Sequence, residues 1–382
     1  MRLKVLTLSL LLFVFGCGKK QEIDCIMGNQ DVIVGGETGQ ELASTQVFRK
    51  NNGTEPGTLD PHRAEGVPAS NVLRDLFEGL IMEDPSGRYI PGAAESWTLT
   101  KDAKTYVFTM RQNGKWSNGD DVTADDFVYG LRRSVDPSTL SNYSSMLYPI
   151  KNARDIVLGI KDPETLGVRS EGPKTLIIEL DEPTPYFLSL LTHSTTYAAH
   201  RPTVEEFGAQ FTRPGNLVGN GAFRLQEWRV QSHIKLVRNT EYWDNKNTTL
   251  EEVYYYPLDD TNSAFKRYRA QELDFTETVL AEQLPWIRQC LPNDLKISPY
   301  FGSYYYGFNN TQPPFKDKPK LRTALSMAID RNVITDIILG AGQIPSYSLV
   351  PPVKSFKAVP ANWSGWTQEK KNQEAQRLYL AS

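Results

Sequence analysis

The segment from Lys115 to Arg133 constrains the fold of this 382-residue chain most strongly, because it combines a turn, a helix start and four carboxylates. Asn118-Gly119 is a turn signal, since both residues tolerate the left-handed backbone that tight turns need. Thr123 suits the N-cap of a helix that follows. Apolar residues then continue at helical spacing, as Phe127, Val128 and Leu131. The segment therefore predicts a tight turn followed by a helix with one buried face.

The four carboxylates of this segment allow two interpretations: Asp120, Asp121, Asp125 and Asp126. Crowded carboxylates can hold a cation or share a proton, which would make the segment a metal or acid-base site. They can also shape the turn and complement the positive end of the helix dipole. The spacing of a calcium loop, with a later Gly and Glu, is not met. We therefore favour turn and cap chemistry and expect no metal.

The length and charge of the chain limit its class. A chain of 382 residues exceeds one ordinary core, so two or more lobes are expected. The formal net charge is -3, from 45 acidic and 42 basic residues, and gives no reason to expect a nucleic-acid partner. No phosphate-binding loop, nucleophile elbow or His-Glu-x-x-His motif occurs, and the four histidines are scattered. We expect no cofactor and no enzyme activity, although distant residues can still meet in a catalytic triad.

The N-terminus has the form of a secretory signal. Arg2 and Lys4 precede an apolar run from Val5 to Phe15, and Gly16-Cys17 follows it. A small residue directly before a cysteine is typical of a lipoprotein signal, in which the cysteine becomes the lipid-modified first residue. We therefore predict a signal peptide at 1–17, a lipid anchor at Cys17 and a flexible tether at 18–45. This places the protein in the periplasm or at the cell surface.

Lipidation of Cys17 would leave Cys25 and Cys290 as the remaining cysteines. An oxidising compartment would allow them to form a disulfide. Because Cys25 falls in the predicted tether, we expect free thiols instead.

Hydrophobic periodicity predicts alternating strands and helices, which favours α/β lobes. Strands are expected at 46–51, 105–111, 174–180, 222–229, 232–239, 253–256 and 301–309. Helices are expected at 69–80, 152–159, 202–207 and 262–271, as one long helix from Pro319 through Ile337, and from Thr367 onward.

Several short motifs follow one another in order from about Gln46 to the end of the chain. They include Leu59-Asp60-Pro61-His62, Glu65-Gly66-Val67-Pro68, Arg74-Asp75-Leu76-Phe77-Glu78-Gly79-Leu80, Ala94-Glu95-Ser96-Trp97, the segment 115–133 and Glu182-Pro183-Thr184-Pro185-Tyr186-Phe187. Any one of them could arise by chance, but the ordered set is specific. With this set the chain resembles the family 5 extracellular solute-binding proteins.

The resemblance implies a two-lobed, periplasmic-binding-protein-like fold with mixed sheets. Such a protein captures short oligopeptides between its lobes and delivers them to the membrane permease of an ABC importer, as a monomer. The implied first lobe comprises 46–77 and 203–301, with a subdomain at 78–202 inserted in it, and 302–382 forms part of a second lobe. The alternatives are another solute, such as a murein peptide or a dipeptide, and a truncated surface lipoprotein that binds nothing.

The resemblance also implies the ligand-binding residues. Glu65, Gly66, Val67 and Pro68 match the loop and strand edge along which the family holds peptide backbone. Tyr143 matches a pocket tyrosine, and Tyr305 lies in a tyrosine strand near the hinge. For each of them the alternative is a purely structural role, since tyrosines often pack in cores and Pro68 can simply end a loop.

Two substitutions and the length depart from the family pattern. Gly302 stands where close members carry a cysteine, so their disulfide is not expected here. Leu339 falls where a basic residue can meet a peptide carboxylate. Family members continue well past Ser382, so we expect an incomplete second lobe with exposed apolar surface, at a cost in stability.

Overall fold

The computed structural model describes residues 25, 42–298, 300, 302–351 and 357–382. The chain divides into two compact units, which we call the large unit (39–280) and the small unit (281–382, together with the segment that holds Cys25). The predicted signal peptide, the predicted lipid anchor at Cys17 and almost all of the predicted tether lie outside the described residues. In the described parts of the chain, no helix is long and apolar enough to cross a membrane.

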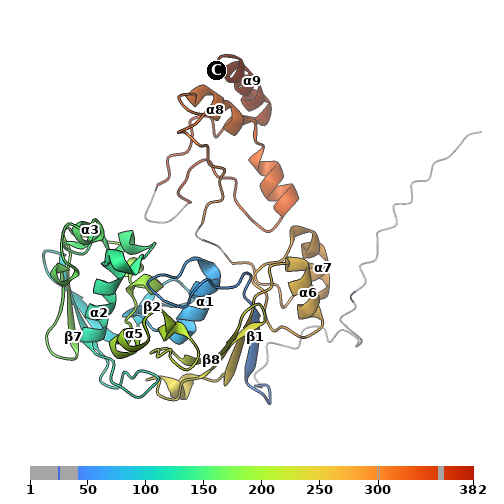
Figure 1. Cartoon of the computed structure of the whole chain (residues 1–382). Helices are drawn as coiled ribbons and strands as arrows, with labels where there is room; N and C mark the ends of the chain where they lie inside the picture. The colour runs from blue at the N-terminus through green and yellow to red at the C-terminus, as the bar shows by residue number, and fades with distance from the viewer. Residues whose placement is uncertain (1–24, 26–41, 299, 301, 352–356) are drawn as a thin grey trace, which may run out of the picture. The chain divides into compact units, whose positions relative to one another are not determined.

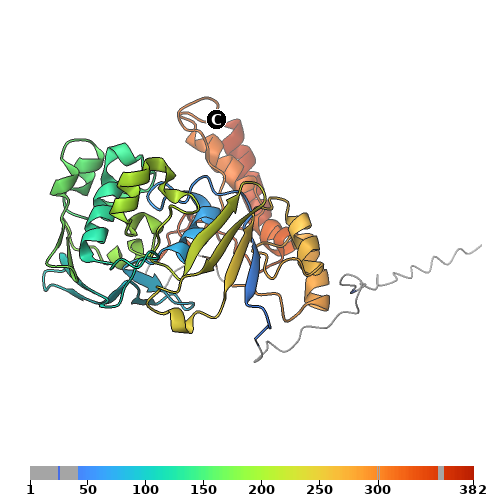
Figure 2. The ribbon, with the colours of Figure 1, turned by 60° about the horizontal axis from the view of Figure 1, so that its bottom comes forward.

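One sheet of the large unit has four strands in the order β1-β10-β9-β8 (Figures 1 and 2). β1 (Val47–Asn51) pairs in parallel with β10 (Glu252–Tyr256), whereas β9 (His233–Arg238) pairs antiparallel with both β10 and β8 (Phe223–Arg229). Alternate side chains are buried, among them Ile234, Leu236 and Val253. All four strands were predicted from the sequence.

A second four-stranded sheet has the order β4-β5-β7-β6, and all of its pairs are antiparallel. Its strands are β4 (Ala94–Leu99), β5 (Thr105–Met110), β6 (Val168–Ser170) and β7 (Thr175–Glu179). A short hairpin of β2 (Ile81–Glu83) and β3 (Tyr89–Pro91) forms a separate ribbon. The predicted strands at 105–111 and 174–180 are confirmed.

The segment 115–133 has the predicted turn and helix. Gly119 adopts a φ of +94°, and α2 (Ala124–Val135) begins after the N-cap Thr123. The carboxylate of Asp126 accepts hydrogen bonds from the Thr123 amide (2.8 Å) and hydroxyl (2.9 Å). The buried face of α2 includes Phe127 and Leu131, and the helix packs against β6 and β7 (Figure 1).

Each carboxylate of this segment has its own partner. Asp120 accepts a hydrogen bond from Asn118 and contacts His200, Asp121 pairs with Lys115, and Asp125 accepts the Ser170 hydroxyl. Turn and cap chemistry is therefore confirmed. Among the residues that the structure describes, no group of three or more His, Cys, Asp or Glu side chains is placed to hold a metal ion.

The remaining helices of the large unit are short, and the predicted ones are present. They are α1 (Gly66–Leu76), α3 (Ala153–Val157), α4 (Phe187–Leu190), α5 (Arg201–Phe207) and α6 (Thr261–Arg269). The core of the unit includes Leu73, Leu76, Phe108, Trp116 and Phe127, all of which are fully buried.

In the small unit, the predicted long helix is wrong. α8 (Pro319–Ala328) ends at Ile329, whose backbone is extended, and a separate π-helical segment follows at Val333–Leu339. The carboxylate of Asp330 accepts hydrogen bonds from the amides of Asn332 and Val333, which starts a new helical segment instead of continuing the first. α7 (Leu284–Cys290) and α9 (Gln368–Leu380) complete the helices, and Thr367 caps α9 as predicted.

The predicted aromatic strand at 301–309 is also wrong in its described part. Residues 302–309 form no strand, and Tyr304, Tyr305 and Tyr306 are exposed. Alternating aromatic residues suit a strand only where a neighbour satisfies their backbone groups. No strand of the small unit's described part offers that pairing.

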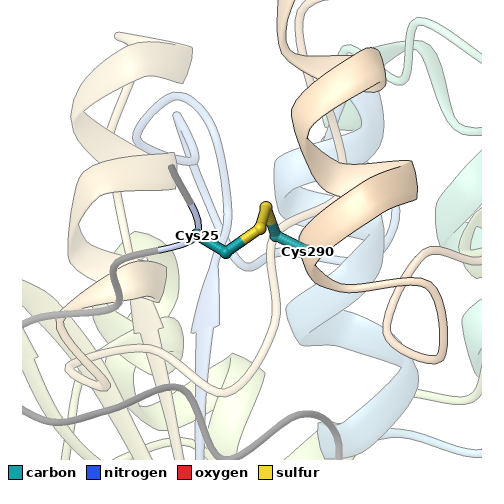
Figure 3. The surroundings of a disulfide bond; sticks show 2 residues. All are labelled: Cys25 and Cys290. Atoms are coloured by element: carbon teal, nitrogen blue, oxygen red, sulfur yellow. A yellow bond between two sulfur atoms is a disulfide. The ribbon is translucent and has the colours of Figure 1, made fainter. Parts of the chain in front are cut away.

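Cys25 and Cys290 form a disulfide (Figure 3). Their Cα atoms are 5.3 Å apart, although 265 positions separate them in sequence. The expectation of free thiols is therefore wrong. It assumed that Cys25 belongs to a freely moving tether, whereas this residue lies against the end of α7.

Candidate functional site

The predicted site residues Glu65 to Pro68 form the start of α1, not a strand edge. Glu65 is the extended N-cap, and Gly66 has a φ of +78°, a conformation that strains any residue with a side chain. Pro68 fits the first helical turn because its ring fixes φ near the helical value. The alternative that Pro68 simply ends a loop is wrong, because the residue lies inside α1.

The first turn of α1 is exposed and has no side-chain cap. Glu65, Gly66 and Val67 face solvent, and Val67 retains 53% of its accessible surface. The N-cap Glu65 makes no side-chain hydrogen bond to the turn. The first amides of a helix have no partner within the helix, so this turn presents N–H donors and the positive end of the helix dipole.

The start of α1 is fastened to the residue that follows β1. The side-chain amide of Asn52 donates to the carbonyl of Pro68 at 2.9 Å, and its oxygen accepts the side-chain amide of Asn71 at 3.0 Å. Asn71 also donates to the carboxylate of Glu277 at 2.9 Å. Glu277 in turn pairs with Lys50 of β1 at 3.0 Å. We call Asn52, Asn71, Glu277 and Lys50 the polar clamp.

The clamp lies at the carboxyl ends of two parallel strands. Asn51 is paired with Tyr256 at the ends of β1 and β10, and the amide of Asn52 donates to the carbonyl of Tyr256 at 2.8 Å. Ligands of α/β proteins commonly bind beyond such strand ends, where helix N-termini and loops converge. Figure 2 shows β1 in blue at the edge of its sheet. The exposed turn of α1 is thus placed where this fold class often binds ligands.

A buried hydrogen bond between β10 and α1 also holds the helix in place. The hydroxyl of Tyr255 on β10 donates to the carboxylate of Asp75 at 2.7 Å. Burial raises the pKa of Asp75, although the Tyr255 hydrogen bond and the charge of Lys50 oppose that rise. Burial, together with the carboxylate of Asp75, also raises the pKa of Tyr255.

The predicted residue Tyr143 lies beside His193, with ring centroids 4.8 Å apart in an edge-on arrangement. Burial lowers the pKa of His193, and the positive charge of Arg74 on α1 lowers it further. The charge of Arg74 on α1 therefore acts on the histidine that contacts Tyr143. The other predicted tyrosine, Tyr305, belongs to the small unit and is 68% exposed.

The sequence interpretation missed most of these partners. Asn52, Asn71, Glu277, Arg74 and His193 were not selected as site residues, although Arg74 lies in a motif that identified the family. A usable signal was present in the sequence only at Asn51 and Asn52, because loop residues next to a strand end are often binding residues.

Comparison with known proteins agrees with this architecture. A sequence profile of bacterial extracellular solute-binding proteins, family 5 (Middle), matches residues 88–379. The chain is 42% identical over 344 residues to the periplasmic oligopeptide-binding protein OppA of Salmonella typhimurium, covering 89% of this chain and 63% of that protein. It is 38% identical over 348 residues to the periplasmic murein peptide-binding protein MppA of Escherichia coli, covering 90% of this chain and 64% of that protein.

Solved structures show the same similarity. The Escherichia coli murein tripeptide-binding protein MppA superposes with a TM-score of 0.85 at 38% identity, covering 89% of this chain and 67% of that one. Haemophilus influenzae OppA in complex with RPPGFSPFR superposes with a TM-score of 0.83 at 38% identity, covering 88% and 67%. The predicted two-lobed α/β fold class is confirmed by these likenesses.

The chain spans less than two thirds of the length of the curated relatives named above. The chain belongs to family 5 of the bacterial extracellular solute-binding proteins.

Proposed function

We propose that this chain is the substrate-binding component of an ABC importer and captures short oligopeptides for a membrane permease. The proposal is supported by relatives that are named for oligopeptide binding and by the solved complex of a Haemophilus influenzae relative with a nonapeptide. It includes no catalysis and no nucleic-acid partner. It also includes a monomeric state and a periplasmic or cell-surface location, with a lipid at Cys17 as the membrane contact.

The single observation that carries the proposal is the exposed first turn of α1. Its amides at Gly66 and Val67 have no side-chain cap, and the polar clamp fixes the turn at the ends of β1 and β10. An extended peptide can be held through its main chain by such fixed N–H donors, while its side chains remain free to vary. This arrangement suits a receptor with broad peptide preference.

We further propose that Tyr143 and Tyr305 contact the ligand from different lobes. In this proposal residues 46–77 and 203–301 form the first lobe, 78–202 its inserted subdomain, and 302–382 part of the second lobe. A ligand that touches both lobes favours the closed state by its extra contacts there. The lobe boundaries and both tyrosine contacts stay predictions.

A murein peptide is the second candidate ligand. This candidate is favoured by the likeness of the chain to the murein tripeptide-binding protein MppA, which has a TM-score of 0.85 and a sequence identity of 38%. A chain that folds but binds no peptide is the third possibility.

Calorimetric titration of the purified chain separates these ligands. One titration uses a mixed pool of short peptides, a second uses murein tripeptide, and a third uses an equal mass of free amino acids. Heat released by the pool alone supports the proposal, and a preference for the murein tripeptide supports the second candidate. No heat from a protein with a cooperative unfolding transition would overturn both.

A further inference from the structure

A cavity of the large unit is lined by residues outside the first turn of α1. It has a volume of about 510 Å³ and opens between the segment 144–149 and the connection from β7 to α4. This volume falls in the range of small-molecule sites. We call it the Asp181 pocket, and the residues used in the argument are Met146, Tyr148, Asp181, Thr184, Tyr186 and Leu190.

The backbone on both sides of the Asp181 pocket is fixed. Ile150 and Leu180 form an antiparallel bridge, and the amide of Asp181 donates to the carbonyl of Pro149 at 3.0 Å. The ammonium group of Lys104 donates to the carbonyl of Asp181 at 2.8 Å. The buried Thr184 holds the next turn through its hydroxyl, which donates to the carbonyl of Glu182 at 2.9 Å. The pocket is thus formed before any ligand arrives, so ordering it costs little binding energy.

Aromatic and apolar side chains line much of the pocket. Tyr148 and Tyr186 contribute rings, and Met146 and Leu190 add flexible apolar surface. Tyr186 remains 62% exposed, so its ring is accessible to a ligand from solvent. Rings of this kind attract cations to their faces, and quaternary ammonium groups are recognised in this way.

The charge of the pocket is negative. The side-chain carboxylate of Asp181 has no hydrogen-bond or ion-pair partner among the residues that the structure describes. The neighbouring carboxylate of Glu182 is different, because Lys104 pairs with it at 3.0 Å. One negative charge is therefore left unpaired in a pocket that Tyr148 and Tyr186 also line.

We propose that the Asp181 pocket binds a small organic ammonium ion. The carboxylate of Asp181 supplies the counter-charge, and Tyr148 and Tyr186 contact the alkyl groups around the nitrogen. A hard metal ion fits less well, because one free carboxylate offers too few oxygen ligands. The lining of the Asp181 pocket shares no residue with the peptide site proposed above, and the proposal does not depend on that site.

Choline and its uncharged isostere 3,3-dimethylbutan-1-ol are suitable probes. Both are titrated into the full chain while saturation-transfer NMR reports on the ligand and chemical shifts report on the protein. We expect choline to bind with an affinity that falls as ionic strength rises, and the alcohol to bind at least about tenfold more weakly. Equal binding of the two would show an apolar crevice only and would overturn the proposal.

Matched variants test the named groups. Asp181→Asn should weaken choline binding by about tenfold, whereas Asp259→Asn, an exposed carboxylate outside the pocket, should leave it unchanged. Tyr186→Leu keeps an apolar side chain and should also weaken binding, while circular dichroism shows that all three variants are folded. An equal loss in the Asp259 variant would mean unspecific attraction and would contradict the assignment. Peptide calorimetry on the same Asp181 variant should be unchanged, so failure of this proposal is distinguishable from failure of the peptide site.

Discussion

The side-chain amide of Asn52 donates to the carbonyl of Pro68 across 2.9 Å and so joins the end of β1 to the first turn of α1. Asn52 is almost fully buried, and its oxygen also accepts Asn71. The first turn of α1 therefore keeps its place without a cap of its own. The Asn52 contacts on its buried side hold the exposed turn in position.

Replacing Asn52 by Ala should destabilise the protein by about 1–3 kcal/mol, because the Pro68 carbonyl and the Asn71 amide lose a partner. Urea unfolding followed by Trp fluorescence measures this change. Asn247→Ala is the control, since Asn247 is exposed and bonds only locally to Asp244. Equal stability of the Asn52 variant and the wild type would show that the clamp contributes nothing.

A proline at position 67 should weaken peptide binding, because it removes an exposed N–H of the first turn of α1 while its fixed φ remains compatible with a helix start. The loss of one hydrogen bond corresponds to about 1 kcal/mol, or about fivefold in Kd. Val67→Ala keeps the amide and serves as the matched control. If calorimetry shows that both variants bind peptide equally, the Val67 amide is not a ligand contact.

The disulfide predicts a specific peptide-mapping result. Proteolysis of the unreduced protein should release a fragment that contains both Cys25 and Cys290, and thiol reagents should label neither residue before reduction. Cys25→Ser with Cys290→Ser should raise amide hydrogen exchange in α7, because a native cross-link typically contributes about 2–4 kcal/mol. Labelling of both cysteines in the unreduced protein would contradict the bond.

Sequence patterns predicted the large unit well because its elements are locally determined. Alternating side chains specify β5, β8, β9 and β10, and the Thr123 cap specifies the start of α2. The small unit was predicted less well. Continuous apolar spacing extended α8 past Ile329, but Asp330 binds the next amides and starts a separate segment.

The candidate site was only partly predictable, since its residues meet through the fold. The resemblance pointed to Glu65–Pro68, but Glu277 reaches Asn71 from 206 positions away, and no local pattern encodes that contact. The pairing of Cys25 with Cys290 was missed for the same reason. The positive φ of Gly66, by contrast, is a local feature that favours glycine and so leaves a trace in the sequence.

His62 should make the protein less stable in mild acid. Its Nε2–H donates to the carbonyl of Tyr197 at 2.9 Å, and its Nδ1 accepts Arg133 at 2.8 Å. Burial and the charge of Arg133 lower the pKa of His62 from 6.5 to about 4, although the charge of Asp60 acts in the opposite direction. Between these values the unfolded chain takes up a proton that the folded protein does not, so stability falls as pH drops from 6.5 to about 4.

The size of this acid effect is on the order of 3 kcal/mol for His62 alone. It is measured as the difference in unfolding free energy between the wild type and His62→Gln across this pH range. The Gln amide can still donate to the Tyr197 carbonyl but takes up no proton. A difference that stays constant with pH would show that His62 does not control acid stability.

Glu78 should produce the opposite slope. This buried carboxylate accepts the Tyr242 hydroxyl at 2.6 Å and the Trp243 indole N–H at 2.8 Å, and burial raises its pKa from 4.5 to about 7 against the effect of those two donors. Between pH 4.5 and about 7 the unfolded chain releases a proton that the folded protein keeps. Stability should therefore fall as pH rises through this window, by on the order of 3 kcal/mol, and stay constant above it.

Glu78→Gln isolates this contribution, because glutamine resembles the protonated acid in shape and does not titrate. The unfolding free energy of the wild type relative to this variant should be highest below pH 4.5 and should decline until about pH 7. Subtracting the variant also removes the opposing slope of His62, which is the same in both proteins. A difference that does not change between pH 4.5 and about 7 would mean that Glu78 is already ionised across this range in the folded protein. The charge of Arg111, which lowers the pKa of Glu78, would then compensate for the burial of this carboxylate.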